Sequence, residues 1–179
     1  MKQFETDYPK FAELGWGPSV QAEKWNGRHA MFGWVVLCAT AYAKGHGLIP
    51  DADVPLDLKE WGTLATISGK STITHERAII LIANVHAFMI GLAATICPLP
   101  FGDPLLLDPN AGDKYDRAAA RNSQPYGVIP AFKMGITDEA EMFNGRLAML
   151  GLVALGFTSL LDNKPMLDVV NEWVGGAYY

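Results

Sequence analysis

The hydrophobic and polar positions divide the chain into three long apolar segments separated by polar connections that contain prolines. Residues 29–43, 78–101 and 147–161 contain no Asp, Glu, Lys or Arg. Together with the turns that precede them, the segments are long enough to cross a bilayer as helices, which takes about 20 residues. A buried helix in a soluble protein of this size would rarely stay apolar on all sides for such a length.

The pattern therefore predicts an all-α fold with three transmembrane helices, in a single domain that covers residues 1–179. A shorter amphipathic pattern near the C-terminus predicts a helix that lies on the membrane surface. The expected bounds are about 21–44, 75–97 and 138–161 for the three spans and about 165–174 for the amphipathic helix.

The distribution of Lys and Arg predicts the orientation of the helices in the membrane, and the net charge argues against nucleic acid as a partner. The side that holds the N-terminus and residues 98–146, with the Arg of each repeat copy assigned to it, carries nine Lys and Arg residues, and the other side carries five. The positive-inside tendency therefore places the N-terminus on the cytoplasm-equivalent face. A formal net charge of −5 and the lack of a dense basic stretch argue against binding to nucleic acid.

The two cysteines indicate neither a metal site nor a disulfide. Cys38 and Cys97 lie inside apolar segments and lack metal-ligand spacing. In the three-span arrangement they lie at opposite depths, about 20 Å apart, which is too far for a disulfide. We expect both to be buried free thiols that act as small hydrophobic residues.

A segment of fifteen residues occurs twice, at positions 23–37 and 141–155. Nine of the fifteen aligned positions are identical, where ordinary residue frequencies would give about one. Each copy begins with a Glu, has an Asn three residues later and an Arg two residues after that, and then becomes apolar. Because a charge at membrane depth costs about 2.5–3.5 kcal/mol, we expect these residues to be paired and functional.

The duplication itself suggests how the charges pair. Two copies that run in the same direction about a two-fold axis along the membrane normal would bring Glu23 to Arg146 and Glu141 to Arg28. The alternative, pairing within one copy, is unfavourable because residues five apart lie about 140° around a helix. Small residues at every third position allow the two backbones to approach closely. They are Gly27, Ala30 and Gly33 in the first copy and Gly145, Ala148 and Gly151 in the second.

The Glu and Asn of each copy share a helix face, and each offers an oxygen atom. Once Arg neutralises the Glu, one carboxylate oxygen stays free to bind a hard cation such as Mg²⁺. A bare Mg²⁺ ion would require more carboxylates than an apolar helix provides. A magnesium ion that a macrocycle already holds needs only one axial oxygen or nitrogen, which is the ligation that chlorophyll requires.

The two motifs, Glu-x-x-Asn-Gly-Arg over 23–28 and over 141–146, resemble the paired motifs of the light-harvesting chlorophyll-binding protein superfamily, whose members are three-helix thylakoid proteins. The resemblance covers nearly the whole chain. It implies that the first and third helices cross about a pseudo-two-fold axis and that each Arg pairs with the Glu of the opposite helix. The implied chlorophyll ligands are Glu23, Asn26, Glu141 and Asn144, and the implied charge clamps are Arg28 and Arg146.

The family also holds carotenoids in the grooves of the crossed helices, and short Asp-Pro segments anchor them. The segment with Asp103, Pro104, Asp108 and Pro109 is similar to one of these. The chain departs from the family at position 26, where the first helix of the family commonly has His and this chain has Asn26. Together with the long connection over 98–138, this favours a red-lineage member, of the group called red-lineage chlorophyll-binding-like proteins (RedCAP type).

Two further departures leave ligands open. The third helix of the family often has Gln where this chain has Thr158, which is a weak ligand. The C-terminal tail often has a His ligand, and this chain offers Asn171 or Glu172 nearby.

The middle apolar segment contributes further candidate ligands. His86 lies in the middle of the span and needs a polar partner; chlorophyll magnesium is our first choice, and a hydrogen bond to a neighbouring helix is the alternative. His75 and Glu76 lie near the membrane edge, where ligation is about as probable as a solvated or capping role.

The sequence therefore predicts an antenna subunit that binds chlorophyll a, a second chlorophyll of c rather than b type, and carotenoids such as xanthophylls. The resemblance implies a multi-pass protein of the chloroplast thylakoid membrane with a stromal N-terminus. Its expected partners are photosystem core subunits, with photosystem I favoured, neighbouring antenna proteins and thylakoid lipids. No catalytic constellation appears, so we expect no enzymatic activity. The alternatives are a photoprotective, energy-dissipating relative and a pigment-free transporter or structural subunit.

Overall fold

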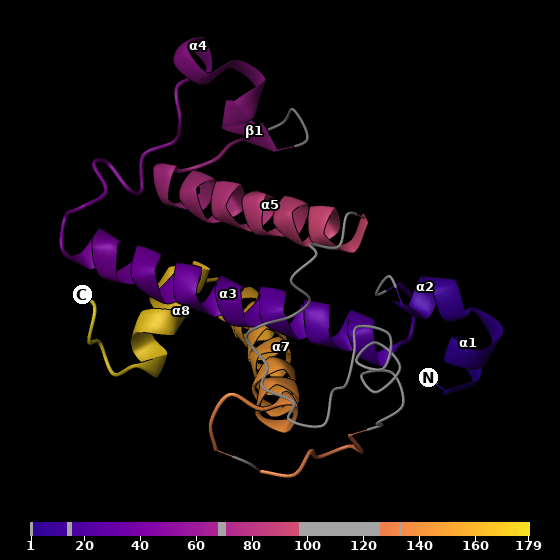
Figure 1. Cartoon of the computed structure of the whole chain (residues 1–179). Coiled ribbons are helices and arrows are strands. Elements are labelled where there is room, and N and C mark those ends of the chain that lie inside the picture. Colours follow the sequence, from indigo (N-terminus) through magenta and orange to yellow (C-terminus); the bar gives the residue numbers. More distant parts are fainter. Residues whose placement is uncertain (1, 14–15, 68–70, 97–125, 133) are drawn as a thin grey trace. The chain divides into compact units, whose positions relative to one another are not determined.

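The computed structural model describes residues 2–13, 16–67, 71–96, 126–132 and 134–179 (Figure 1). The chain divides into two compact units, which consist of residues 1–32 with 88–152 and of residues 33–87 with 153–179. The unit boundaries fall inside the three longest helices rather than in the connections. That residues 1–179 form a single domain stays a prediction.

The described part of the chain is mostly helical, which confirms the all-α class. Its one sheet is an antiparallel pair of two-residue strands, with Thr66 opposite Thr72 and Ile67 opposite Ser71. The helices are α1 (Lys2–Asp7), α2 (Pro9–Glu13), α3 (Val20–Gly45), α4 (Leu58–Trp61), α5 (His75–Ile96), α7 (Asp138–Leu161) and α8 (Met166–Trp173). A 3₁₀ turn, η1 (Gly62–Ala65), precedes the strands β1 (Thr66–Ile67) and β2 (Ser71–Thr72).

The three long helices and α8 begin and end within one residue of the predicted bounds. Within the described part of the chain, one helix, α7, is both long and apolar enough to cross a membrane. Charged residues at both ends of α3 dilute its apolar stretch. The apolar stretch of α5 continues in the sequence into residues outside the described part. The prediction of three spans thus goes further than this finding.

In the first unit, α3 and α7 begin at equivalent positions of the repeat. The hydroxyl group of Ser19 accepts a hydrogen bond from the backbone N–H of Ala22 (3.1 Å), and that of Thr137 accepts one from Ala140 (3.2 Å). Such N-caps satisfy a backbone donor that the helix leaves without a partner. The repeat therefore includes the helix caps, and both copies of the Glu-Asn-Arg motif start in the first turn of their helix.

In the second unit, the connection after α3 folds into a small substructure of its own. A cluster of buried apolar side chains joins this connection, including η1, to the start of α5; its members are Leu56, Ala65, Ile73 and Ala78. The sequence pattern predicted only a polar connection between the first two apolar segments. The apolar positions of this connection are too few and too irregularly spaced to indicate an element by themselves, and its contacts are within the connection and with the start of α5.

Candidate functional site

The N-terminal parts of α3 and α7 join through two ion pairs between the copies of the repeat. Arg28 Nε donates to Glu141 Oε1, and Arg146 Nε and Nη2 donate to the two carboxylate oxygens of Glu23, the latter at 3.2 Å. The structure thus confirms cross-pairing over pairing within one copy. Both pairs lie in the first unit.

Two glycines allow the helices to approach closely enough for these pairs to form. A Cβ atom placed on Gly27 would lie 2.9 Å from the Cα of Gly145, and the reciprocal distance is also 2.9 Å. Ordinary van der Waals contact begins at about 3.4 Å, so no larger residue fits without moving a backbone. Gly27 and Gly145, which the sequence predicted to allow close packing, therefore bring the two backbones together at the point where the ion pairs form.

The two glutamates are not equivalent. Both oxygens of Glu23 accept hydrogen bonds from Arg146. At Glu141, Oε1 accepts from Arg28, whereas the buried Oε2 has no hydrogen-bond partner among the described residues. The side chain of Glu141 is only 10% exposed. A buried carboxylate oxygen without a partner is costly and indicates an atom or group that completes its coordination.

Arg146 has further partners in the chain before α7. Its Nη1 donates to the carbonyl oxygens of Gly127 and Val128, the latter at 2.9 Å. Gly127 has a φ of 65°, which favours glycine and turns the chain at this point. The guanidinium group therefore bridges a carboxylate on α3 and an irregular segment that leads into its own helix.

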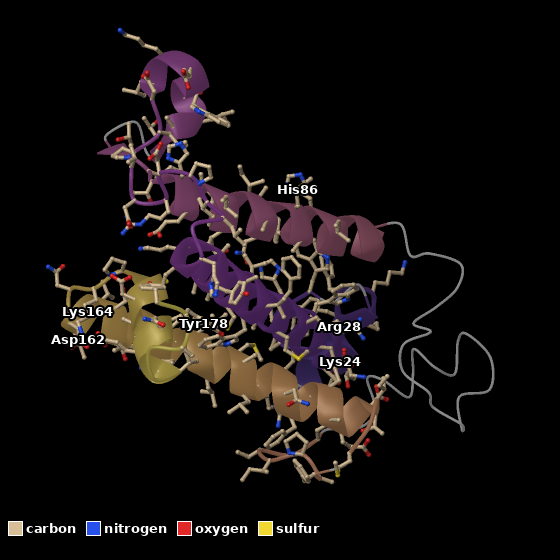
Figure 2. All side chains as sticks on the ribbon, turned by 90° about the vertical axis from the view of Figure 1, so that its left-hand side faces the viewer. Lys24, Arg28, His86, Asp162, Lys164 and Tyr178 are labelled. Atoms are coloured by element: carbon tan, nitrogen blue, oxygen red, sulfur yellow. The ribbon has the colours of Figure 1, made fainter. Side chains whose placement is uncertain are left out.

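A third ion pair joins the same two helices, and the sequence pattern did not predict it. Lys24 Nζ lies 2.7 Å from Asp138 Oδ1, and the lysine side chain is 1% exposed (Figure 2). The Nζ atom also lies 5.6 Å from the centre of the Tyr126 ring. The available signal was a difference within the repeat, because the position equivalent to Lys24 is Met142.

The amides that were predicted as ligands point outward. Asn26 and Asn144 are both exposed, and the amide group of Asn144 donates to the carbonyl of Ala140 (2.8 Å). That bond fixes the side chain and leaves its oxygen, Oδ1, to accept from or coordinate a group outside the helix. The ligand role of both residues stays a prediction.

His86 projects outward from α5 (Figure 2). Its Nδ1 lies 2.8 Å from the carbonyl oxygen of Ile82 in the same helix. A proton on Nδ1 satisfies that carbonyl and leaves the lone pair on Nε2, which is the arrangement of a nitrogen ligand. Neighbouring side chains on α5 are apolar and exposed, with Ile82 at 52% and Val85 at 49%. Among the described residues, the structure shows no hydrogen bond between His86 and a neighbouring helix, which was the alternative.

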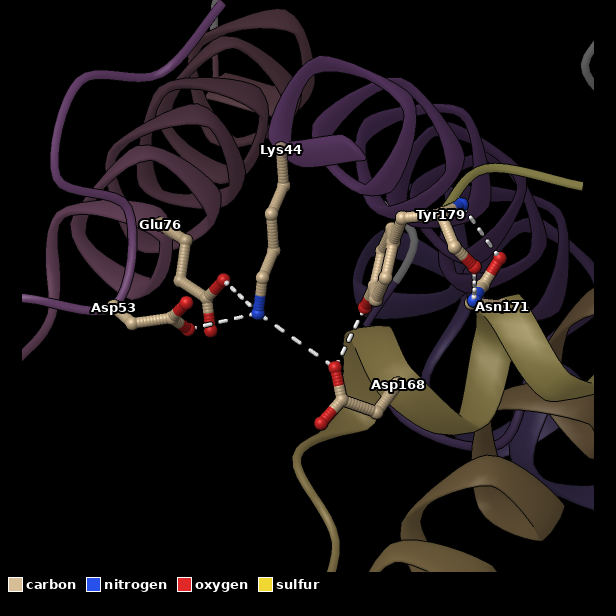
Figure 3. A network of polar contacts seen from close by, with 6 residues as sticks. All are labelled: Lys44, Asp53, Glu76, Asp168, Asn171 and Tyr179. Atoms are coloured by element: carbon tan, nitrogen blue, oxygen red, sulfur yellow. Dashed lines mark hydrogen bonds and ion pairs between the residues drawn. The ribbon is translucent and has the colours of Figure 1, made fainter. Parts of the chain in front are cut away.

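His75 and Glu76 occupy more enclosed positions in the second unit. His75 Nδ1 lies 2.8 Å from the carbonyl oxygen of Val54. Glu76 is 3% exposed, and its Oε2 lies 3.0 Å from Lys44 Nζ (Figure 3). Glu76 therefore has a charged partner at the end of α3. Ligation of magnesium by Glu76 stays a prediction, and a magnesium ion would have to compete with Lys44 for this carboxylate.

The residues near the C-terminus fold back on one another. The side chain of Asn171 accepts from the backbone N–H groups of Tyr178 (2.9 Å) and Tyr179 (3.3 Å) and donates to the carbonyl of Tyr179 (2.6 Å). These bonds use the donor and acceptor atoms that ligation would need, so the structure gives Asn171 a structural role. Glu172 lies 2.5 Å from Lys164.

The hydroxyl group of Tyr179 donates to Asp168 (2.6 Å), whose carboxylate also lies 3.6 Å from Lys44 (Figure 3). Burial of the ring, together with this hydrogen bond, raises the pKa of Tyr179 well above its usual range. Lys44 also lies 2.8 Å from Asp53. One lysine thus joins the end of α3 to the following connection, to α5 and to α8.

Some predicted residues lie outside the described part of the chain. These are Asp103, Pro104, Asp108 and Pro109 of the carotenoid segment and Cys97. Cys38 is a free thiol, as predicted, and it is half-buried rather than buried.

No family model matches the chain, and no curated protein matches it. The residues themselves therefore carry the argument about function.

Proposed function

We propose that this protein is a light-harvesting antenna subunit that binds chlorophylls and carotenoids in a thylakoid membrane. The observation that carries the proposal is the pair of Arg–Glu contacts between the repeats, with one buried oxygen of Glu141 that lacks a hydrogen-bond partner among the described residues. Arg28 balances the charge of the Glu141 carboxylate and holds one of its oxygens, and the other oxygen would be available to hold a magnesium ion that a macrocycle already binds. A magnesium ion that a macrocycle already holds needs one ligand from the protein, whereas bare Mg²⁺ needs several oxygen ligands.

The donor set fits the group. Glu141 would hold one magnesium through Oε2, Asn144 a second through Oδ1 and His86 a third through Nε2. The corresponding residues of the first copy are Glu23 and Asn26. When bound, chlorophyll supplies the absorption of light and the excited state that passes to neighbouring pigments. The residues of this chain fix the position and orientation of each pigment on a rigid helix, and no residue breaks or forms a bond in a substrate.

The proposal includes three membrane spans. Apolar side chains that remain exposed along α5 and α7 support it. Examples are Ile82 (52%), Phe88 (60%) and Ile90 (70%) on α5, and Leu150 (68%) and Phe157 (63%) on α7. A soluble protein rarely leaves so many large apolar side chains in water, whereas lipid or pigment would cover them. The same proposal includes subunits of the photosystem I core as partners of this protein, a location in the chloroplast and a c-type accessory chlorophyll.

The absorption spectrum of the protein, purified gently from its native membrane, tests the proposal. We expect red absorption bands of chlorophyll, and solvent extraction followed by chromatography should yield chlorophyll a, a c-type chlorophyll and xanthophylls. A colourless preparation with intact helices would rule out the antenna function. The lifetime of the excited state then separates harvesting from dissipation, because a short lifetime under all conditions would indicate a dissipating protein.

Site variants extend this test to single ligands. In protein refolded with a pigment extract, Glu141→Gln and His86→Ala should each remove chlorophyll from the complex. Asn84→Ala is a matched control on α5, because the amide group of Asn84 donates to Ile80 of the same helix and is half-buried. Equal pigment content in all three variants would contradict the assigned ligands.

A further inference from the structure

The segment that leads into α7 exposes five large apolar side chains within nine residues. Their exposed fractions lie between 67% and 93%, and the residues are Val128, Ile129, Phe132, Met134 and Ile136. Apolar side chains that are exposed singly are normal on a protein surface, whereas a run of this density indicates a surface that an apolar partner covers. The segment belongs to the first unit, as does the part of α7 that it contacts.

The backbone of this segment is fixed against α7 at three points. The carbonyl oxygens of residues 127–128 accept hydrogen bonds from Nη1 of Arg146. The ring of Phe132 meets that of Phe143 edge to face, with 5.8 Å between the ring centres. The hydroxyl group of Thr137 caps the helix. The exposed side chains therefore extend from a backbone that is held beside the first turns of α7.

The contact with Arg146 sets the level of the segment along α7. The apolar run of this helix begins at residue 147, directly after Arg146, and the first turn of the helix carries three acidic residues. In the proposed membrane span, the polar surroundings therefore end and the hydrocarbon begins near Arg146. Residues 127–128 lie at that level because they bind its guanidinium group. Leu147 and Leu150 expose apolar side chains just beyond it.

The charge of the segment and its place beside a membrane span favour lipid as the partner. Between residues 126 and 137 the sequence holds one charged residue, Lys133, although the net charge of the chain is −5. A basic residue among apolar and aromatic side chains is typical of segments that lie on a membrane with anionic lipids. A second copy of this chain would cover the same side chains, but lipid surrounds a membrane span at all times and needs no association.

The backbone restricts how deep the segment can lie in the membrane. The described residues 126–132 and 134–137 contain no helix or strand. Irregular backbone does not occur in contact with lipid in the hydrocarbon core, because its N–H and C=O groups would lack partners there, whereas the headgroup region still contains water. Segments in this region bury their apolar side chains about 5–10 Å into the boundary between headgroups and acyl chains. The segment before α7 therefore fits the membrane interface.

We propose that residues 128–136 form an interfacial anchor, which lies in the lipid headgroup region with its apolar side chains among the adjoining ends of the acyl chains. Arg146 is a positioning residue for the anchor, because its Nη1 holds the carbonyl oxygens at the start of the segment while its other nitrogen atoms bind Glu23. The inference rests on the membrane location in the proposed function and goes beyond it by naming lipid as the partner of this surface.

Spin labels at three positions test the anchor in the full chain. The protein, with Cys38→Ala and Cys97→Ala, is refolded with a pigment extract into vesicles of phosphatidylcholine and phosphatidylglycerol. A nitroxide is attached at Ile129→Cys in the anchor, at Leu150→Cys within α7 or at Asp162→Cys after α7. Asp162 is the matched control, because it is exposed and directly follows the helix that the anchor precedes (Figure 2). Electron paramagnetic resonance then measures how often each label collides with oxygen, which dissolves in lipid, and with a nickel chelate, which stays in water.

We expect the label at position 150 to collide mainly with oxygen and the label at 162 mainly with the nickel chelate. The label at 129 should lose most of the nickel collisions that the label at 162 shows, and should gain collisions with oxygen. If it behaves like the label at 162 while the label at 150 stays in lipid, the anchor is overturned and the membrane location stands. Shielding of position 129 from both reagents would also overturn the anchor, because a protein surface then covers the segment. A label at 150 in water would refute the membrane span on which the proposed function depends.

A second measurement needs no substitution, so it decides the question even where the cysteine-free chain fails to refold. The unaltered protein is irradiated in vesicles that contain phosphatidylcholine with a diazirine group near the glycerol end of its acyl chain, and mass spectrometry locates the adducts. We expect adducts within residues 128–136 and none within residues 162–164. Adducts on α7 together with an unmodified segment 128–136 would contradict the anchor.

Discussion

The contact between Gly27 and Gly145 gives a sharp prediction about stability. In the variant Gly145→Ala, the new methyl carbon would lie 2.9 Å from Gly27 Cα, about half an ångström short of ordinary contact. The obstacle is backbone rather than a flexible side chain, so the helices α3 and α7 must separate. Arg28–Glu141 and Arg146–Glu23 flank this contact, and both pairs would lengthen as the helices move apart.

The size of the effect follows from a comparison of two glycines on α7. Overpacking costs about 1–3 kcal/mol, whereas Gly→Ala within a helix gains up to about 1 kcal/mol from helix propensity. Gly156 lies on the same helix, and a Cβ atom there would meet nothing within 4 Å. Because both variants share the gain in propensity, the difference between Gly145→Ala and Gly156→Ala isolates the packing cost of about 1–3 kcal/mol.

The assay is reversible unfolding of the refolded protein in detergent micelles, followed by far-ultraviolet circular dichroism and tryptophan fluorescence. Gly156→Ala should be as stable as the unaltered protein or more so, and Gly145→Ala should be less stable. If the free energies of unfolding of the two variants differ by less than about 0.5 kcal/mol, which is the range of substitutions without structural effect, the close contact of the helices does not exist as described.

Three further predictions concern the ion pairs and the C-terminal region. Arg146→Leu leaves Glu23 without its charged partner and should lower the free energy of unfolding by about 3 kcal/mol. This figure is at the low end for a buried ion pair because both side chains are 21% exposed. An unchanged unfolding midpoint would contradict this prediction. Asn171→Ala removes three hydrogen bonds to residues 178 and 179 and should cost about 1 kcal/mol or more for each; limited proteolysis should then cleave the tail faster than in Glu172→Ala, which removes only an exposed pair. Because the folded protein holds the Tyr179 proton more tightly than the unfolded chain does, its contribution to stability should be complete below about pH 10, the usual pKa of tyrosine, and should fall as the pH rises further. Tyr179→Phe should weaken that alkaline loss in thermal unfolding from pH 8 to 11, and an identical pH dependence in the variant would contradict the assignment.

Local patterns in the sequence were sufficient for the helices and for the principal pairing. The apolar runs and their charged ends gave the bounds of α3, α5, α7 and α8 to within one residue, because helix length and capping depend mainly on nearby residues. The duplicated motif predicted that Arg28 pairs with Glu141 and Arg146 with Glu23, because residues five apart in one helix lie too far around it to pair with each other.

Tertiary structure decided what differs between the copies and what the remaining polar residues do. Lys24 pairs with Asp138, and Arg146 donates hydrogen bonds to the carbonyl oxygens of Gly127 and Val128. These contacts join positions that are far apart in the chain. Asn171 binds the backbone of residues 178 and 179 rather than standing free as a ligand. The physical reason is that a repeat specifies equal helices, whereas the surroundings of each helix come from segments that the repeat does not include.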